Sequence, residues 1–161
     1  MFNCKSHILL LIAVTITSNA QASLEFNYNC RKAYEHVTAL RFSKANQYIE
    51  AEKKSNVQNH LIILAENYRD CMEIILNENK SLLKKLVSQK DLRLKILEAA
   101  DEQSPYFLYA QAEVNMQWAF AHIKNGEYLN GVLEINRAYN MLTKNVKKFP
   151  RFIPHYKSIG L

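Results

Sequence analysis

The segment 104–142 constrains the fold more than any other part of the sequence, because it predicts two helices joined by a tight turn. Ser104 can cap the free N–H groups of a new helix, and Pro105 then occupies the first helical position, where no N–H is needed. Asn125 and Gly126 both tolerate a left-handed backbone, so they predict the end of this helix and a reversal of the chain.

Apolar and small residues recur along both stretches at steps of three and four, which places them on one face of each helix. In the first stretch they are Tyr109, Ala112, Met116, Ala119, Phe120 and Ile123. In the second they are Tyr128, Leu129, Val132, Ile135, Tyr139, Leu142 and Val146. The second helix is expected to end at Phe149, because Pro150 disfavours a helical conformation in the residue before it.

The rest of the sequence predicts a single all-helical domain. Only three glycines and three prolines interrupt the 161 residues. No run alternates apolar and polar residues between turn signals, as a strand would. The expected further helices cover residues 30–40, 42–54 and 59–76, and then 81–87 and 91–100 as either one helix or two.

Residues 1–22 have the composition of a secretory signal peptide. Lys5 precedes a short apolar run over residues 8–16, and Ala20-Gln21-Ala22 forms an A-x-A cleavage site. The run is shorter than the roughly 20 apolar residues that span a bilayer. We therefore expect cleavage near Ala22 and an extracytoplasmic domain, periplasmic or secreted, over residues 23–161. Retention of the apolar run as a membrane anchor is the alternative.

The formal net charge is +6, and the basic residues gather in two stretches. The first holds Lys80, Lys84, Lys85, Lys90, Arg93 and Lys95, and the second Lys144, Lys147, Lys148, Arg151 and Lys157. Basic surfaces bind nucleic acid or anionic membranes. An exported chain rarely meets nucleic acid, and lysines on helix faces are usually solvated. We expect no nucleic-acid partner, and binding to an anionic membrane is kept as a further hypothesis.

The sequence offers little chemistry. Glu66, Asp70 and Glu73 lie on one helix face, but Arg69 sits among them, so no metal site is expected. The five histidines have no ligand spacing, and no phosphate-binding loop, nucleophile elbow or dinucleotide motif is present. We expect no cofactor, no small-molecule ligand and no catalysis.

Two cysteines remain after the expected cleavage, Cys30 and Cys71. An oxidising compartment would allow them to form a disulfide. Cys71, however, belongs to an apolar stripe, where a thiol behaves as a small core residue. Both readings stay open. The stripe comprises Leu61, Leu64, Ala65, Tyr68, Cys71, Met72, Ile75 and Leu76.

The hairpin resembles the tetratricopeptide repeat, whose pattern is W-x2-L-G-x2-Y, then A-x3-F, then P, on a helical pair of 34 residues. Trp118-Ala119 stands at the L-G pair and Gly131-x3-Ile135 at A-x3-F. Leu61-x2-Leu64-Ala65-x2-Tyr68 matches the first helix of another unit. The small residues at 33, 65, 119 and 160 are spaced unevenly, by 32, 54 and 41 residues. The resemblance therefore implies an irregular tetratricopeptide-like α-solenoid of antiparallel helix pairs.

The resemblance extends to exported bacterial members of that superfamily and implies no particular reaction. It implies a scaffold that binds another protein or a peptide on a concave face lined by the first helix of each unit. Met116 and Phe120 occupy the places where some family members clamp a carboxylate, so that activity is not implied. The expected partner-binding residues are Ile62, Glu66, Arg69, Asp70, Glu113, Gln117, Phe120 and Lys124.

Pro150 and Pro154 separate the hairpin from a short apolar segment at residues 155–161, which matches the opening of another repeat. Solenoids normally finish with a polar capping helix. We therefore expect the chain to be a fragment truncated within its final repeat, which leaves the outer face of the second hairpin helix, along Leu133 and 135–142, without a neighbour. The alternative function is a helical accessory domain of a larger membrane-associated protein or enzyme whose catalytic part lies beyond residue 161.

Overall fold

The computed structural model describes residues 22–160, which fold into seven α-helices and one short 3-10 helix. The α-helices are α1 Tyr28–Thr38, α2 Phe42–Ser55, α3 Ile63–Asn77, α4 Lys80–Glu98, α5 Tyr106–Lys124, α6 Tyr128–Lys148 and α7 Pro154–Ile159, and the 3-10 helix η1 is His60–Ile62. Within this range the only β-pairing is an isolated bridge between Ser23 and Asn59. The all-helical prediction is therefore confirmed. The predicted signal peptide falls on residues outside this range, except for Ala22.

Asparagine side chains begin several of the helices. Asn27, Asn59 and Asn79 accept hydrogen bonds from backbone N–H groups at the starts of α1, η1 and α4. The Ser104 hydroxyl accepts a hydrogen bond from the N–H of Tyr106 at 3.2 Å. Helix α5 begins at Tyr106, one residue after the start predicted at Pro105. Gly126, with φ of 81°, turns the chain into α6 as predicted. These short polar side chains satisfy N–H groups that a helix start leaves free.

The region 80–98 is one continuous helix rather than two. It contains neither glycine nor proline, so nothing in its backbone interrupts the hydrogen-bond ladder. Its expected apolar face is only partly buried: Leu83 and Leu97 are buried, but Val87 is 40% exposed. The basic residues Lys90 and Arg93 are buried as well. Within residues 22–160 no helix is both long enough and apolar enough to cross a membrane.

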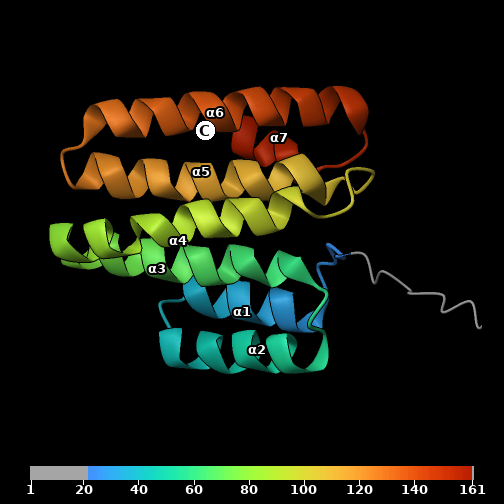
Figure 1. Ribbon diagram of the computed structural model, residues 1–161, viewed down its shortest axis with the longest axis horizontal. Coiled ribbons are helices and arrows are strands. Elements are labelled where there is room, and N and C mark those ends of the chain that lie inside the picture. The colour runs from blue at the N-terminus through green and yellow to red at the C-terminus, as the bar shows by residue number, and fades with distance from the viewer. Residues whose placement is uncertain (1–21, 161) are drawn as a thin grey trace, which may run out of the picture.

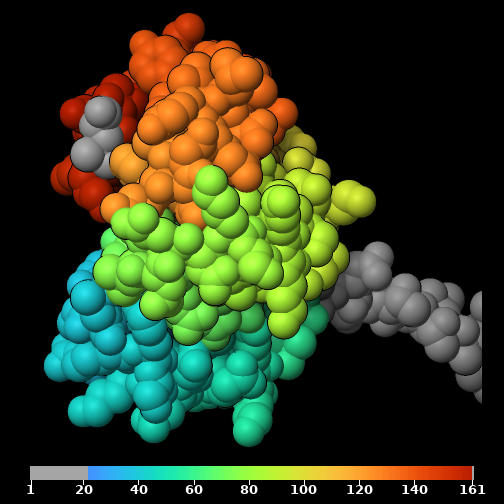
Figure 2. Space-filling model, turned by 90° about the vertical axis from the view of Figure 1, so that its left-hand side faces the viewer, coloured from blue at the N-terminus to red at the C-terminus, as the bar shows by residue number. Residues whose placement is uncertain are grey.

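The helices lie side by side in a layered stack that runs from α2 and α1 through α3 and α4 to α5 and α6 (Figure 1). Helix α5 contacts α3, α4 and α6, and α1 contacts α2 and α3. Short α7 folds back against α5 and α6. The view along the helices shows α7 (red) on one side of the stack, beside the α5–α6 hairpin (orange) (Figure 2).

The core is centred on Trp118 of α5, which is fully buried among apolar residues of α3 and α4. Cys30 and Cys71 are both buried and both free. Burial raises the pKa of Cys30 to about 12 and moves the pKa of Cys71 upward as well. The two thiols therefore behave as small core residues, which is the second of the two readings from the sequence.

Helices α5 and α6 approach closely at Gly131. A Cβ atom at this position would lie 2.5 Å from Cγ1 of Ile123 and 3.2 Å from the carbonyl oxygen of Ala119. Ala112 and Ala138 are fully buried in the same interface. These small residues allow the two helices to approach closely, since larger side chains would force the helices apart.

The outer face of α6 carries exposed apolar residues. The prediction for the second hairpin helix is confirmed at Leu133, but Ala138 and Leu142 within 135–142 are buried. Leu129, Val132 and Leu133 are 83%, 60% and 54% exposed. In the described part of the chain α6 packs mainly on α5 and α7, and the buried ion pair of Glu134 with Lys90 also joins it to α4.

Candidate functional site

Four helices that are distant in sequence build a groove of about 380 Å³, which we call the acid groove. Its walls are mostly apolar or aromatic, with two polar residues of α5, Glu113 and Gln117, on one side. The lining residues are Tyr34 of α1, Tyr68, Cys71, Met72 and Ile75 of α3, Glu113, Met116, Gln117 and Phe120 of α5, and Lys157 and Ser158 of α7. An apolar cleft with a few polar groups has the composition of a ligand site.

A second groove of about 500 Å³ adjoins the first, and we call it the aromatic groove. Both grooves include Tyr34 and Lys157, and Lys157 Nζ lies 6.0 Å from the centroid of the Tyr34 ring. The two grooves therefore adjoin at this pair, and we call them together the trough. The aromatic groove is lined by Phe26, Arg31, Tyr34, Glu35, Leu64, Tyr106, Tyr109, Ile153, Pro154 and Lys157.

Three tyrosines, Tyr34, Tyr68 and Tyr109, are close enough to Glu113 for its charge to affect their pKa values. The rings of Tyr34 and Tyr68 are stacked, with centroids 5.3 Å apart and planes at 28°. Burial raises the pKa of Tyr34, Tyr68 and Tyr109, and the negative charge of Glu113 raises the pKa of each further. The tyrosines consequently stay protonated at neutral pH and present neutral rings beside a negative charge.

Glu113 is a buried acid that lacks a basic partner. Glu113 is only 8% exposed, and one of its carboxylate oxygens accepts a hydrogen bond from the hydroxyl of Ser158. Among residues 22–160 it takes part in no ion pair. By contrast, the buried acids Asp70 and Glu134 pair with Arg93 and Lys90. A buried carboxylate is stabilised by hydrogen bonds or by an opposite charge, and Glu113 has the first but not the second, so the acid groove keeps a negative charge that no basic side chain neutralises.

A chain of hydrogen bonds sets the orientation of Gln117. Asn67 Oδ1 accepts from Trp118 Nε1 at 2.9 Å and from Arg93 Nη1 at 3.1 Å. Asn67 Nδ2 must then be a donor, and it donates to Gln117 Oε1 at 2.7 Å. This leaves the Nε2 donor of Gln117 buried and without a partner in the described part of the chain. The wall of the acid groove therefore contains one buried amide donor without a partner, on the same helix as the Glu113 carboxylate.

The α5 residues predicted to bind a partner lie at or near the acid groove. Glu113, Gln117 and Phe120 all line it, and Phe120 is 47% exposed. Lys124 lies at the end of α5, where its Nζ is 2.8 Å from a carboxylate oxygen of Glu78 in an exposed ion pair.

The structure places the four α3-side residues away from the acid groove. Ile62 belongs to the core and is 3% exposed. Arg69 and Asp70 form an ion pair at 2.5 Å, and Asp70 also pairs with Arg93 at 2.5 Å. Glu66 pairs with Lys53 at 2.7 Å. The residues of α3 that do line the groove are Tyr68, Cys71, Met72 and Ile75.

The sequence contained a signal for these four groove residues, since all of them belong to the apolar stripe predicted for residues 61–76. The stripe by itself predicts a face buried in the core. It is wider than one contact face, so part of it covers α5 while its edge remains open to the groove. Tyr34 and the α7 residues carried no signal of their own, because their place in the groove depends on how separate helices pack.

Two of the three carboxylates that share a face of α3, Glu66 and Asp70, form ion pairs with basic side chains. Asp70 is held by two arginines, and Glu66 by Lys53. Within the described range no group of three or more histidine, cysteine, aspartate or glutamate side chains is placed to hold a metal ion.

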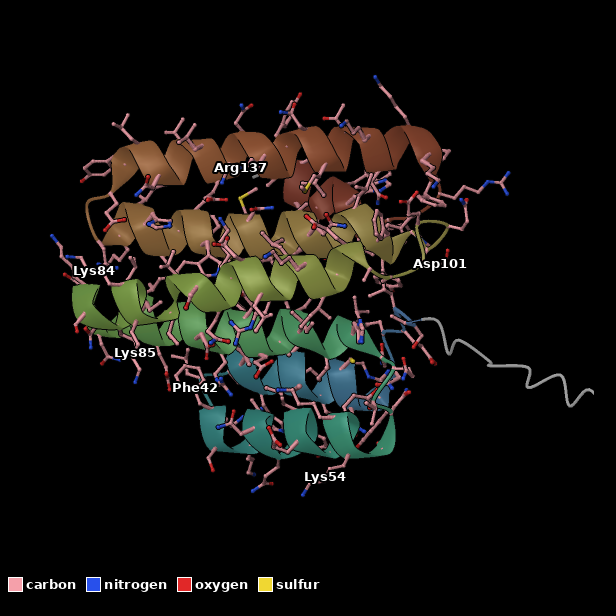
Figure 3. The ribbon with its side chains drawn as sticks, in the orientation of Figure 1. Phe42, Lys54, Lys84, Lys85, Asp101 and Arg137 are labelled. Atoms are coloured by element: carbon pink, nitrogen blue, oxygen red, sulfur yellow. The ribbon has the colours of Figure 1, made fainter. Side chains whose placement is uncertain are left out.

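The first basic stretch does not form a single exposed surface. Lys90 is buried in an ion pair with Glu134, and Arg93 in one with Asp70. Lys84 and Lys85 are exposed near the start of α4 (Figure 3). The stretch therefore contributes isolated charges to the surface and two structural ion pairs to the interior.

Comparison of the chain with protein families, with curated proteins and with solved structures finds no match in any of the three.

Proposed function

We propose that the chain is an exported, irregular tetratricopeptide-like α-solenoid that binds an extended peptide segment of another protein in the trough formed by the acid and aromatic grooves. We propose no catalysis of its own. The helices α1, α3, α5 and α7 contribute to the trough, and the first three of these have their partner helices, α2, α4 and α6, beside them in the stack (Figure 1).

The free Nε2 donor of Gln117 is the observation that carries this proposal. A buried donor without an acceptor costs free energy, of the order of 1–3 kcal/mol, and a ligand carbonyl would recover it. An extended peptide supplies such a carbonyl at every residue and also supplies side chains for the apolar walls.

Selection of capped peptides from a random display library on the full 161-residue chain tests the proposal, with affinities measured by fluorescence anisotropy. Phe120→Lys should weaken the selected peptides about tenfold or more, because Phe120 lines the acid groove and its loss removes an aromatic contact. The matched control is Val132→Lys, a substitution at a position that is 60% exposed on the outer face of α6.

Unchanged affinity in the Val132→Lys variant, together with the loss in Phe120→Lys, is the expected pattern. The proposal fails if the selected peptides lose affinity through Val132→Lys alone, or if Phe120→Lys leaves their affinity unchanged. Thermal unfolding of both variants shows whether they remain folded.

A further inference from the structure

We propose that the acid groove selects a basic side chain, lysine or arginine, of the bound peptide, and that Glu113 is the residue that pairs with it. The inference rests on the proposed function, since it names the chemistry of the segment that the trough accepts.

The charge of the acid groove supports a cationic occupant. Glu113 is buried and has no basic partner in residues 22–160, whereas Asp70 and Glu134 pair with basic side chains. Glu52 also lacks a basic partner, but three asparagine amides donate to it and it does not line a groove of this kind. Water is largely excluded from the position of Glu113, so an incoming ammonium or guanidinium group would interact with its carboxylate more strongly than at an exposed surface. A basic side chain of a ligand could therefore form the ion pair that Glu113 does not form within residues 22–160.

The tyrosine rings add a second attraction for a cation. Tyr34 and Tyr68 line the acid groove, and their stacked rings stand beside Glu113. A cation within about 6 Å of an aromatic face is attracted by the ring quadrupole, and the attraction grows when the site is desolvated. Lys157 already uses the Tyr34 ring in this way, with its Nζ 6.0 Å from the ring centroid.

Gln117 lies four residues after Glu113, and therefore on the same face of α5. Its Nε2 donor is buried and without a partner, so a turn of the Gln117 side chain toward the groove would let it meet a backbone carbonyl of the peptide while Glu113 meets the basic head group. A single lysine or arginine residue in a peptide contains both of these groups. The pair thus recognises a basic residue within a chain, rather than an isolated anion or an uncharged side chain.

Lys157 is the basic residue that lines the acid groove in the absence of a ligand. It is exposed and forms no ion pair among residues 22–160. Its charge opposes the entry of another cation. Lys157→Gln should therefore strengthen the binding of basic probes severalfold, without effect on neutral ones.

The test is an NMR titration of the full chain with three capped amino acids: N-acetyl-lysine methylamide, N-acetyl-arginine methylamide and the neutral N-acetyl-norleucine methylamide. We expect both basic probes to shift the side-chain amide signal of Gln117, and to bind about tenfold or more tightly than the norleucine probe. Glu113→Gln should abolish this preference. Its amide oxygen can still accept from Ser158, so the fold is preserved, as a melting curve would show.

Glu50→Gln is the matched control, because Glu50 is an exposed carboxylate on α2. It should leave the preference for basic probes unchanged. Equal affinity for the lysine and norleucine probes, or a preference that survives Glu113→Gln, overturns the inference. Absence of any groove shift with either basic probe also overturns it. In each case a library-selected peptide that still depends on Phe120 leaves the proposed function standing, so the two failures are distinguishable.

Discussion

At the scale of single residues, buried carboxylates are satisfied by amides as well as by basic side chains. Glu52 is 1% exposed and accepts hydrogen bonds from Asn27 at 2.6 Å, Asn59 at 2.7 Å and Asn29 at 2.9 Å. These bonds join α2 to the start of α1 and to η1. Glu52 is buried on the same helix as Ala45 and Ile49, and the local sequence of α2 cannot identify three partners from other segments.

Glu52→Gln should lower the free energy of unfolding by about 3 kcal/mol at pH 7, because a glutamine side chain has one acceptor oxygen in place of two and no charge. Burial acts to raise the pKa of Glu52, but the hydrogen bonds from Asn29, Asn59 and Asn27 outweigh it and the net pKa is lowered. The stabilisation is complete above the unfolded pKa of about 4.3 and is lost as the pH falls through the lower folded pKa.

Urea unfolding of the two proteins at pH 7, 5 and 3 measures this effect. The difference in free energy of unfolding should be constant from pH 7 to 5 and should shrink towards pH 3. Glu50→Gln, on the exposed side of α2, should change stability little at any of these pH values. A difference that persists undiminished at pH 3 contradicts the role given to the Glu52 carboxylate.

At the scale of elements, the ends of helices depend on particular backbone conformations. Leu40, which follows α1, has a φ of 56°. The N–H of Leu40 donates to the carbonyl of Val37, and the N–H of Arg41 donates to that of His36, which together form a Schellman motif. Glycine normally occupies the left-handed position because a Cβ atom is strained there. The Leu40 side chain is 48% exposed, so the strain is offset by little packing.

Leu40→Gly should therefore raise the free energy of unfolding, by about 1 kcal/mol, through relief of the left-handed strain. Leu40→Ala is the matched control: it removes the same side chain but retains a Cβ atom, so it should not stabilise the protein. Thermal unfolding of both variants by circular dichroism measures the difference. A Gly variant no more stable than the Ala variant contradicts this account of the α1–α2 turn.

Most helix boundaries could be predicted from the sequence, because caps and breakers act locally. Ser104, Gly126 and Pro150 each act within a few residues, and the helices they delimit lie where they were expected. The orientation of α3 was harder to predict. Its apolar stripe is wide, so the stripe alone does not show which edge is open. The resemblance placed Glu66 and Arg69 on the concave face, whereas in the structure they form ion pairs away from the acid groove. Only the packing of α1, α5 and α7 decides which edge of the stripe stays open.

At the scale of the whole molecule, two unlike surfaces lie on the stack. One is the trough across α1, α3, α5 and α7, with a buried acid and a free donor. The other is the outer face of α6, with exposed Leu129, Val132 and Leu133. The sequence predicted the second surface only in part, at Leu133, because the side of α6 that faces α5 contains the small residues Gly131 and Ala138 and not most of its large apolar residues. It predicted only the α5 part of the first, since a groove between helices requires the arrangement of all of them.

The central claim is that a peptide binds in the trough, and site-specific photo-crosslinking tests it most directly. The full chain would carry benzoylphenylalanine in place of Phe120 on the trough or of Val132 on the outer face of α6, both of which are exposed. After irradiation with a library-selected peptide, the account predicts covalent adducts from position 120 and none from position 132. Adducts from position 132, with none from position 120, would contradict it.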